Sequence, residues 1–228
     1  MTKKLAKSAI SQKRVLDAAA KIFRDYGYAG TTMRAIADEA DLKAGSIYYH
    51  YKSKDDLISA VLDLGIHAVT DLVKKALDEL PADATGRQRV ETAVHAHLAA
   101  IIEYGDYTLA TRRVFGQVPE AIRAKNMRLR NSYAAMWQDI LVEAQKRGEF
   151  RSSANISLAR LFILGALNWT VEWFKPGGRP IEEVSREFAA VIIDGLDLKG
   201  SAAETVIGDG GAKAKAPRST ARVRVVQG

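Results

Sequence analysis

Apolar residues recur at helical spacing through most of the chain, and this period is what most constrains the fold. The first such segment, residues 15–26, places apolar side chains three or four positions apart and is followed by Gly27, a residue type that often ends helices. The same period predicts further helices over 33–40, 43–49, 53–81, 87–104, 107–115, 119–148, 155–174 and 181–196. We therefore expect an all-α protein with about nine helices.

Composition excludes several classes of protein. The chain has 228 residues, of which 47% are hydrophobic, and it contains no Cys, so disulfide frameworks, thiolate metal sites and cysteine nucleophiles are excluded. The N-terminal segment lacks the apolar core of a secretory signal, and the uncharged stretch 161–171 is far shorter than the roughly 18 residues typical of a membrane span. We expect a soluble, cytoplasmic protein without a membrane partner.

The positive charge is unevenly distributed. Residues 1–54 carry 11 Lys and Arg against 5 Asp and Glu, residues 55–198 carry 17 against 20, and residues 199–228 carry 6 against 2. A basic N-terminal segment on a slightly acidic body favours a polyanionic partner at that end. The last segment is rich in small, polar and basic residues, which cannot bury enough apolar area to offset the entropy of ordering, so we expect a disordered basic tail.

Two short predicted helices, 33–40 and 43–49, are joined by a tight link and flanked by a longer helix on each side. This order is typical of a helix-turn-helix unit. Thr31 and Thr32 offer a hydroxyl cap for the first short helix, and Ser53 offers one for the long helix that follows. We expect a DNA-binding domain over 1–54, with a basic arm at 1–9, and a second helical domain over 55–198.

A recognition helix needs small or polar residues at its N-terminal end, where bulky side chains would hold the backbone away from base edges. Ala44, Gly45 and Ser46 meet this condition, and Arg34 is suited to a bidentate contact with guanine. The remaining candidate DNA contacts are donors or planar side chains that suit phosphates or a thymine methyl group: Thr32, Lys43, Tyr48, Tyr49, His50 and Lys54.

The stretch TTMRAIADEADLKAGSIYYHYKSKDDL, with the helix before it, resembles the DNA-binding region of the TetR family of bacterial repressors. The resemblance implies a bacterial, nucleoid-associated regulator in which residues 55–198 form a ligand-binding and dimerisation domain. It also implies a homodimer that pairs through its last two helices, binds a palindromic operator on double-stranded DNA and releases it when a small molecule enters the C-terminal domain. The chain departs from the family where Asp41-Leu42-Lys43 replaces the usual Gly-Val-Ser. We expect this change to strain the turn and to leave the next helix without a hydroxyl cap.

The C-terminal domain has a diffuse set of candidate effector contacts. They are the aromatic, apolar and histidine side chains at helical spacing: His95, Leu98, Ile101, Ile102, Tyr104, Phe115, Tyr133, Met136, Trp137, Trp169 and Trp173. The stretch NWTVEWFKPGG also resembles TetR relatives that respond to acyl-coenzyme A thioesters. That resemblance implies phosphate donors among Arg112, Arg113, Arg123, Lys125, Arg128 and Arg130, although these residues also fit a solvated helix face, and Glu172 stands where such relatives can carry Arg.

Two other classes of function compete with a ligand-controlled regulator. An enzyme is disfavoured, because no phosphate loop, serine elbow or metal-ligand spacing occurs, and His95 and His97 point apart on a helix. We expect no catalytic residue, metal or cofactor. The alternative is a nucleoid-associated protein that binds DNA nonspecifically through its basic tail, which would lose affinity for all DNA alike as salt rises.

Overall fold

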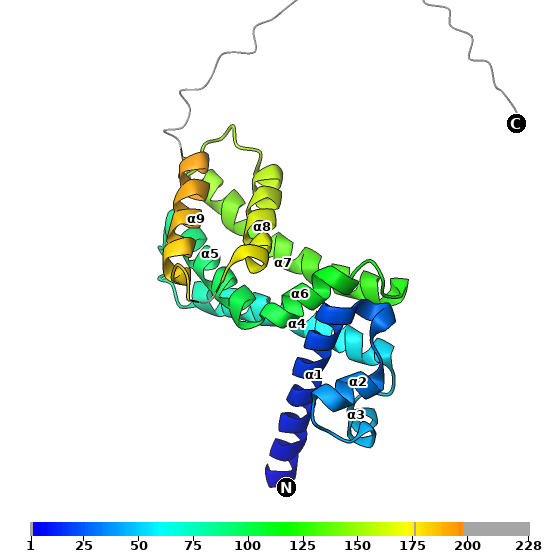
Figure 1. Ribbon diagram of the computed structural model, residues 1–228. Coiled ribbons are helices and arrows are strands. Elements are labelled where there is room, and N and C mark those ends of the chain that lie inside the picture. Colours follow the sequence, from blue (N-terminus) through cyan, green and yellow to red (C-terminus); the bar gives the residue numbers. More distant parts are fainter. Residues whose placement is uncertain (1, 176, 198–228) are drawn as a thin grey trace, which may run out of the picture.

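The computed structural model describes residues 2–175 and 177–197 (Figure 1), and within them nine helices form the expected all-α fold. The helices are α1 (Thr2–Gly30), α2 (Met33–Glu39), α3 (Ala44–His50), α4 (Lys54–Asp78), α5 (Gly86–Glu103), α6 (Gly105–Val114), α7 (Glu120–Lys146), α8 (Ile156–Trp173) and α9 (Ile181–Leu196). The proposed basic tail, 199–228, lies outside the described residues.

The N-terminal head consists of α1, α2, α3 and the start of α4. Its core is built from the predicted apolar stripe, with Val15, Ala19 and Phe23 of α1 fully buried against Ile36 and Ile47. The expected arm at 1–9 continues α1 as helix from Thr2 onward, because this segment is rich in good helix formers even though it lacks an apolar stripe. The head therefore presents a long first helix beside the helix-turn-helix pair (Figure 1).

Local chain signals end and begin these helices where the sequence predicts. Gly27 adopts φ 70°, which breaks α1 one turn before its last residue. Thr32 accepts a hydrogen bond from the Ala35 amide at 3.1 Å and caps α2, and Ser53 accepts one from the Asp56 amide at 3.0 Å and caps α4.

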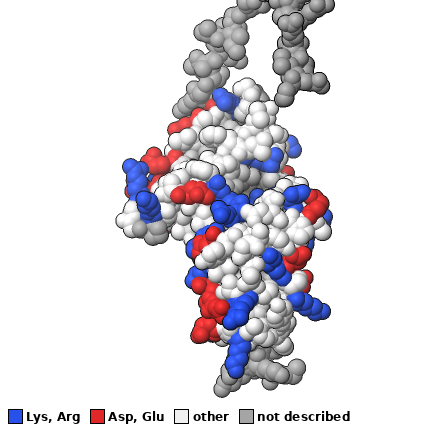
Figure 2. All heavy atoms as spheres, turned by 45° about the vertical axis from the view of Figure 1, so that its right-hand side comes forward, with Lys and Arg blue, Asp and Glu red and all other residues white. Residues whose placement is uncertain are grey.

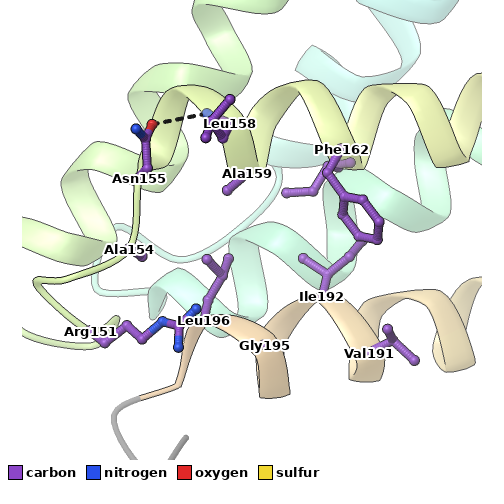
Figure 3. Close-up of a pocket in the computed structure, with 11 residues that line it drawn as sticks. Arg151, Ala154, Asn155, Leu158, Ala159, Phe162, Val191, Ile192, Gly195 and Leu196 are labelled. Carbon is purple, nitrogen blue, oxygen red and sulfur yellow. Dashed lines mark hydrogen bonds between the residues drawn. The ribbon is translucent and has the colours of Figure 1, made fainter. Parts of the chain in front are cut away.

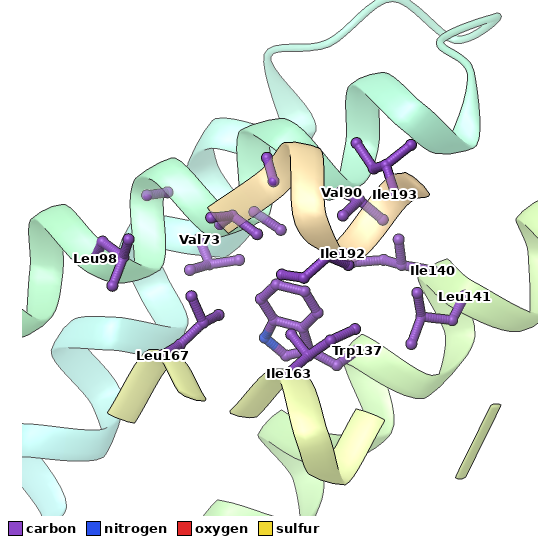
Figure 4. Close-up of a cluster of buried hydrophobic side chains, with 14 of the residues drawn as sticks. Val73, Val90, Leu98, Trp137, Ile140, Leu141, Ile163, Leu167, Ile192 and Ile193 are labelled. Carbon is purple, nitrogen blue, oxygen red and sulfur yellow. The ribbon is translucent and has the colours of Figure 1, made fainter. Parts of the chain in front are cut away.

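The C-terminal body, α5 to α9 with the second half of α4, packs around a separate apolar cluster. Figure 4 shows Trp137 of α7 at its centre, with Val73 of α4, Ile163 and Leu167 of α8 and Ile192 of α9 around it. The indole is fully buried. The cluster fixes α7, α8 and α9 around α5.

Two helices belong to both parts of the molecule. The first half of α4 contributes Leu57 and Val61 to the head core, whereas Val69 and Val73 further along the same helix lie in the body core. Helix α6 packs closely against α1 and adds Ala110 and Val114 to the head core. The domain boundary at residue 54 stays a prediction, since the head core draws on helices beyond it.

No helix among the described residues has the length and apolar character needed to cross a membrane.

Candidate functional site

The exposed face of α3 carries the residues predicted to read DNA. Ala44 and Gly45 at its start are exposed, and Tyr48 and Tyr49 are 54% and 76% exposed, whereas Ile47 is buried in the head core. Burial of Ile47 on one side of a two-turn helix directs the two tyrosines outward. The exposed face of α3 therefore has small residues at its N-terminal end and two tyrosine side chains further along.

The turn before α3 has the strain that its sequence predicts. Asp41 adopts φ 49° and is the only residue other than glycine with positive φ in the described part of the chain. Lys43 stands at the N-cap of α3 and makes no capping hydrogen bond with its side chain. Arg14 of α1 steadies the turn from the other side, because its guanidinium donates to the Ala40 carbonyl at 2.7 Å and the Asp41 carbonyl at 3.3 Å.

The predicted phosphate donors differ in how free they are. Arg34 is exposed on α2, while the Thr32 hydroxyl already caps that helix. His50 lies half-buried against α1, with its Nε2 atom 3.1 Å from the Ser11 hydroxyl. The contact with Ser11 orients the His50 ring toward α1.

Lys54 is bound within the head. Its ammonium donates to the Tyr28 carbonyl at 2.8 Å and the Thr31 carbonyl at 3.2 Å, and it lies 4.3 Å from the centre of the Tyr28 ring. The cation therefore closes the end of α1, a structural task that its place in the sequence did not reveal.

On the face shown in Figure 2, Lys and Arg side chains alternate with Asp and Glu over the lower half of the molecule. The excess of positive charge in the head is therefore not gathered into one patch on that face. Sequence reading would then depend on individual side chains rather than on bulk charge.

A cavity of about 460 Å³ lies in the body, between α4, α5, α6, α7 and α8. Most of its wall is apolar, which suits a ligand with a hydrocarbon portion. The lining residues are Leu62, Gly65, Ile66, Val69, His97, Ile101, Thr108, Thr111, Arg112, Met127, Arg130, Asn131, Tyr133, Ala134, Arg160, Leu161, Leu164, Gly165, Asn168 and Trp169.

Three guanidinium groups stand in this wall. Arg112 lies 4.3 Å from the centre of the Trp169 ring and pairs with Glu172 at 2.7 Å, which accounts for the acidic residue at that position. Arg160 donates from Nε to the Gln138 side chain at 3.1 Å. Because Arg112 and Trp169 are both exposed, they mark the opening of the cavity.

Arg130 is held over the Phe115 ring, 4.9 Å from its centre, and its Nε donates to Asn126 at 3.2 Å. The surrounding protein partly desolvates this side chain, which lowers the pKa of its guanidinium. No carboxylate pairs with Arg130 in the part of the chain that the structure describes.

The inner wall holds a buried polar pair. His97 is 1% exposed, and its Nδ1 lies 2.5 Å from the hydroxyl of Tyr133, which is 5% exposed. The Nε2 atom of His97 has no hydrogen-bond partner among the described residues. Burial lowers the pKa of His97 to about 3, so the imidazole is neutral at physiological pH.

The cavity includes only some of the predicted effector contacts. Ile101, Tyr133 and Trp169 line it, as do Arg112 and Arg130 from the predicted cations. Arg123 instead pairs with Glu120 and Lys125 with Asp63, and Arg113 and Arg128 point elsewhere on exposed helix positions. Leu98 and Ile102 are also absent from the lining.

Six further candidates lie outside the cavity wall, each with another neighbour. His95 lies 3.0 Å from the Ser185 hydroxyl, and Tyr104 borders a hollow between α1, α4 and α6. The Phe115 ring lies under the guanidinium of Arg130, and Trp173 stacks on Phe188. Met136 and Trp137 pack in the body core.

Among the Arg and His side chains of the cavity wall, His97 and Arg160 were not predicted as contacts. His97 has a signal in the sequence, since it interrupts the apolar row formed by Ala93 and Ile101, four positions to each side. A polar residue within a buried row indicates a specific partner.

A second hollow of about 380 Å³ lies between α8 and α9 (Figure 3). Figure 3 shows Leu158 and Phe162 of α8 above Val191 and Ile192 of α9. Leu158, Phe162 and Val191 are each more than 60% exposed, at 63%, 64% and 66%. This is an apolar face without a cover in the described residues, and such faces mark interaction sites.

The family model for the tetR family of bacterial regulatory proteins matches residues 15–61, and the model for the tetracycline-repressor-like C-terminal domain matches residues 83–196. A helix-turn-helix head on a helical body that encloses a cavity is the architecture of a DNA-binding regulator that responds to a ligand. The chain belongs to the TetR family of transcriptional regulators, and it is not an enzyme.

Named relatives agree with this family. The transcriptional repressor KstR2 of Mycolicibacterium smegmatis is 30% identical over 197 residues, which span 82% of this chain and 91% of that protein. The crystal structure of the regulator PfmR from Thermus thermophilus has a TM-score of 0.72 at 26% identity, over 81% of this chain and 99% of that one. The structure of AibR in complex with isovaleryl coenzyme A and operator DNA has a TM-score of 0.68 at 20% identity, over 82% and 98% of the two chains.

Proposed function

We propose that this protein is a homodimeric repressor that binds a palindromic operator and is released by an acyl-coenzyme A thioester. The observation that carries the proposal is the cavity of about 460 Å³ with Arg112, Arg130 and Arg160 in an otherwise mostly apolar wall. An acyl-coenzyme A thioester has a hydrocarbon chain that fits the apolar wall and phosphates that pair with the guanidinium groups. The neighbour AibR, whose structure holds isovaleryl coenzyme A, supports this choice of ligand class.

The head supports operator binding. Ala44, Gly45 and Ser46 allow α3 to approach the base edges closely. Arg34 supplies the guanine contact, and the exposed Tyr49 contacts the DNA phosphate backbone. A two-fold dimer would set two α3 helices about 34–36 Å apart, one turn of DNA, or a small multiple of that distance.

The exposed apolar face of α8 and α9 supports pairing with a second copy. Leu158, Phe162 and Val191 would be covered by the same residues of a partner, because a two-fold axis brings identical surfaces together. Covering them removes large apolar side chains from water, which favours association.

The two shared helices offer a route from the cavity to the head. Gly65 of α4 and Thr111 of α6 line the cavity, and a Cβ placed on Gly65 would lie 3.4 Å from the Tyr107 Cβ, so the two helices are in close contact there. Tyr107 donates to Asp17 of α1 at 2.8 Å, and Arg24 of α1 pairs with Asp106 of α6. A ligand that displaces α6 would therefore move α1 and the head with it.

The test uses DNA that the protein itself enriches from a random pool, which should contain an inverted repeat. Isovaleryl coenzyme A and longer acyl-coenzyme A thioesters should release this DNA in fluorescence anisotropy, whereas coenzyme A alone and the free acids should not. Arg112→Ala should raise the thioester concentration needed for release about tenfold. Arg113→Ala is the matched control, because the neighbouring side chain is exposed outside the cavity and its loss should change nothing.

Release by free acids alone would contradict the thioester assignment. Equal effects of Arg112→Ala and Arg113→Ala would show that Arg112 takes no part in effector binding.

A further inference from the structure

The buried pair of His97 and Tyr133 differs in exposure from Arg112 and Arg130 in the same cavity wall. Arg112 and Trp169 mark the exposed opening, whereas His97 lies on α5 and is 1% exposed. Ile101, one turn further along the same helix, also lines the cavity. Because this imidazole is buried and neutral, it cannot supply the positive charge that phosphates require.

The contact with Tyr133 determines which nitrogen of His97 carries the proton. The two side chains share one proton position, since Nδ1 and the phenol oxygen are 2.5 Å apart. A phenol is a stronger acid than the N–H of a neutral imidazole, and the bare ring nitrogen is the stronger base, so the tyrosine donates to Nδ1. The proton of the neutral ring is then on Nε2.

This assignment leaves a buried N–H without an acceptor. The Nε2 atom is shielded from solvent and unpaired among the described residues, while the ring lies in the cavity wall. A buried donor without a partner is costly, and native proteins rarely keep one without a role. Phenylalanine at both positions would fill similar space without this cost.

We propose that His97 Nε2–H is a specificity contact for an oxygen atom in the acyl group of the effector, so that the preferred ligand is an oxo- or hydroxyacyl thioester rather than a plain hydrocarbon one. Tyr133 acts as a positioning residue that sets the tautomer. The inference rests on the proposed function, since it names the acyl group within the same effector class. It is independent of the cationic opening, which binds the other end of the molecule.

The experiment compares pairs of acyl-coenzyme A thioesters of equal chain length that differ in one ketone oxygen, with the oxygen placed at successive positions. Affinity is measured by isothermal titration calorimetry on the full chain. In the wild type, at least one oxo compound should bind about tenfold more tightly than its saturated counterpart. The double variant His97→Phe/Tyr133→Phe should bind both members of that pair equally.

Two further variants separate recognition from folding. His97→Gln retains an N–H donor near the Nε2 position and should keep most of the preference for the oxo compound. Thr170→Val removes a fully buried hydroxyl on α8 that does not line the cavity, and it should keep the preference in full. The double variant should unfold at the same temperature as the wild type or higher, because it removes an unpaired donor together with the group bonded to it.

Each outcome decides one claim. Equal wild-type affinity for both members of every pair overturns the role of His97 while leaving thioester binding intact. A preference that persists in the double variant also overturns it. Failure of all thioesters to bind refutes the proposed function itself.

Discussion

The strained turn before α3 leads to a sharp stability prediction. Asp41 adopts φ 49°, a conformation that costs a residue with a Cβ roughly 1–2 kcal/mol, with Asp near the lower end because it tolerates this region. Its side chain is fully exposed and lies 3.7 Å from Arg14, and an ion pair so exposed contributes nothing measurable. Asp41→Gly therefore removes strain without removing a useful contact.

The expected gain is small but measurable. Relief of about 1 kcal/mol is partly offset by about 0.5 kcal/mol, because glycine has more freedom in the unfolded chain. The net gain of about 0.5 kcal/mol corresponds to about 1–2 °C in melting temperature for a protein of this size. Asp41→Ala is the matched control, since it removes the same carboxylate but keeps the Cβ, and it should be about 1 kcal/mol less stable than Asp41→Gly.

Urea unfolding followed by far-ultraviolet circular dichroism measures all three proteins at one protein concentration, since association would otherwise shift the midpoint. The midpoints should rank Gly above Asp and Asp at or above Ala, with equal slopes. If the alanine variant is as stable as the glycine variant, relief of backbone strain does not explain the gain in stability. Loss of the Asp41 charge would then have to explain it.

Three further predictions concern the body, the head and the cavity, in that order. Gly86→Ala should destabilise the protein by about 1–3 kcal/mol in the same urea assay, because the new Cβ would lie 2.3 Å from the Ala144 Cβ; an unchanged midpoint would contradict this close approach. Lys54→Met should cost about 1–2 kcal/mol through loss of its two hydrogen bonds to carbonyls at the end of α1, whereas exposed Lys52→Met should be neutral. The pKa of His97 is lowered to about 3, so the unfolded chain binds a proton there first as pH falls, and stability is lost below the unfolded pKa of about 6.5. Between about pH 7.5 and 5.5 the wild type should lose about 1.4 kcal/mol more than His97→Phe, and parallel pH profiles would refute the burial argument.

The helix order was predictable because the apolar period and the chain-breaking residues agree along the chain. Gly27, Thr32 and Ser53 act as local signals whose effect needs no distant contact, and each does in the structure what its position predicts. The beginning of α1 was not predicted, because the prediction relied on the apolar period. Residues 2–9 form helix without an apolar stripe, so that period starts only where α1 enters the core.

The candidate effector site was predictable only as a region. An aromatic or histidine residue on a buried helix face fits a cavity wall and a packed core equally well, and Trp137 and Tyr133 of the same helix illustrate both outcomes. His95 and His97 are two positions apart, and the rotation of α5 directs one toward Ser185 and the other into the cavity wall. This rotation is set by packing against other helices rather than by α5 itself.

The sequence by itself determined the all-α class, the helix-turn-helix motif, the family and the strained turn at Asp41, because these depend on spacing and backbone preferences within short segments. Only the tertiary structure decided that Lys54 closes α1, that Arg112, Arg130 and Arg160 meet around one cavity, and that His97 is held by Tyr133 with its second nitrogen unpaired. These relations join residues tens of positions apart. Their geometry is fixed by how whole helices pack, which no local pattern records.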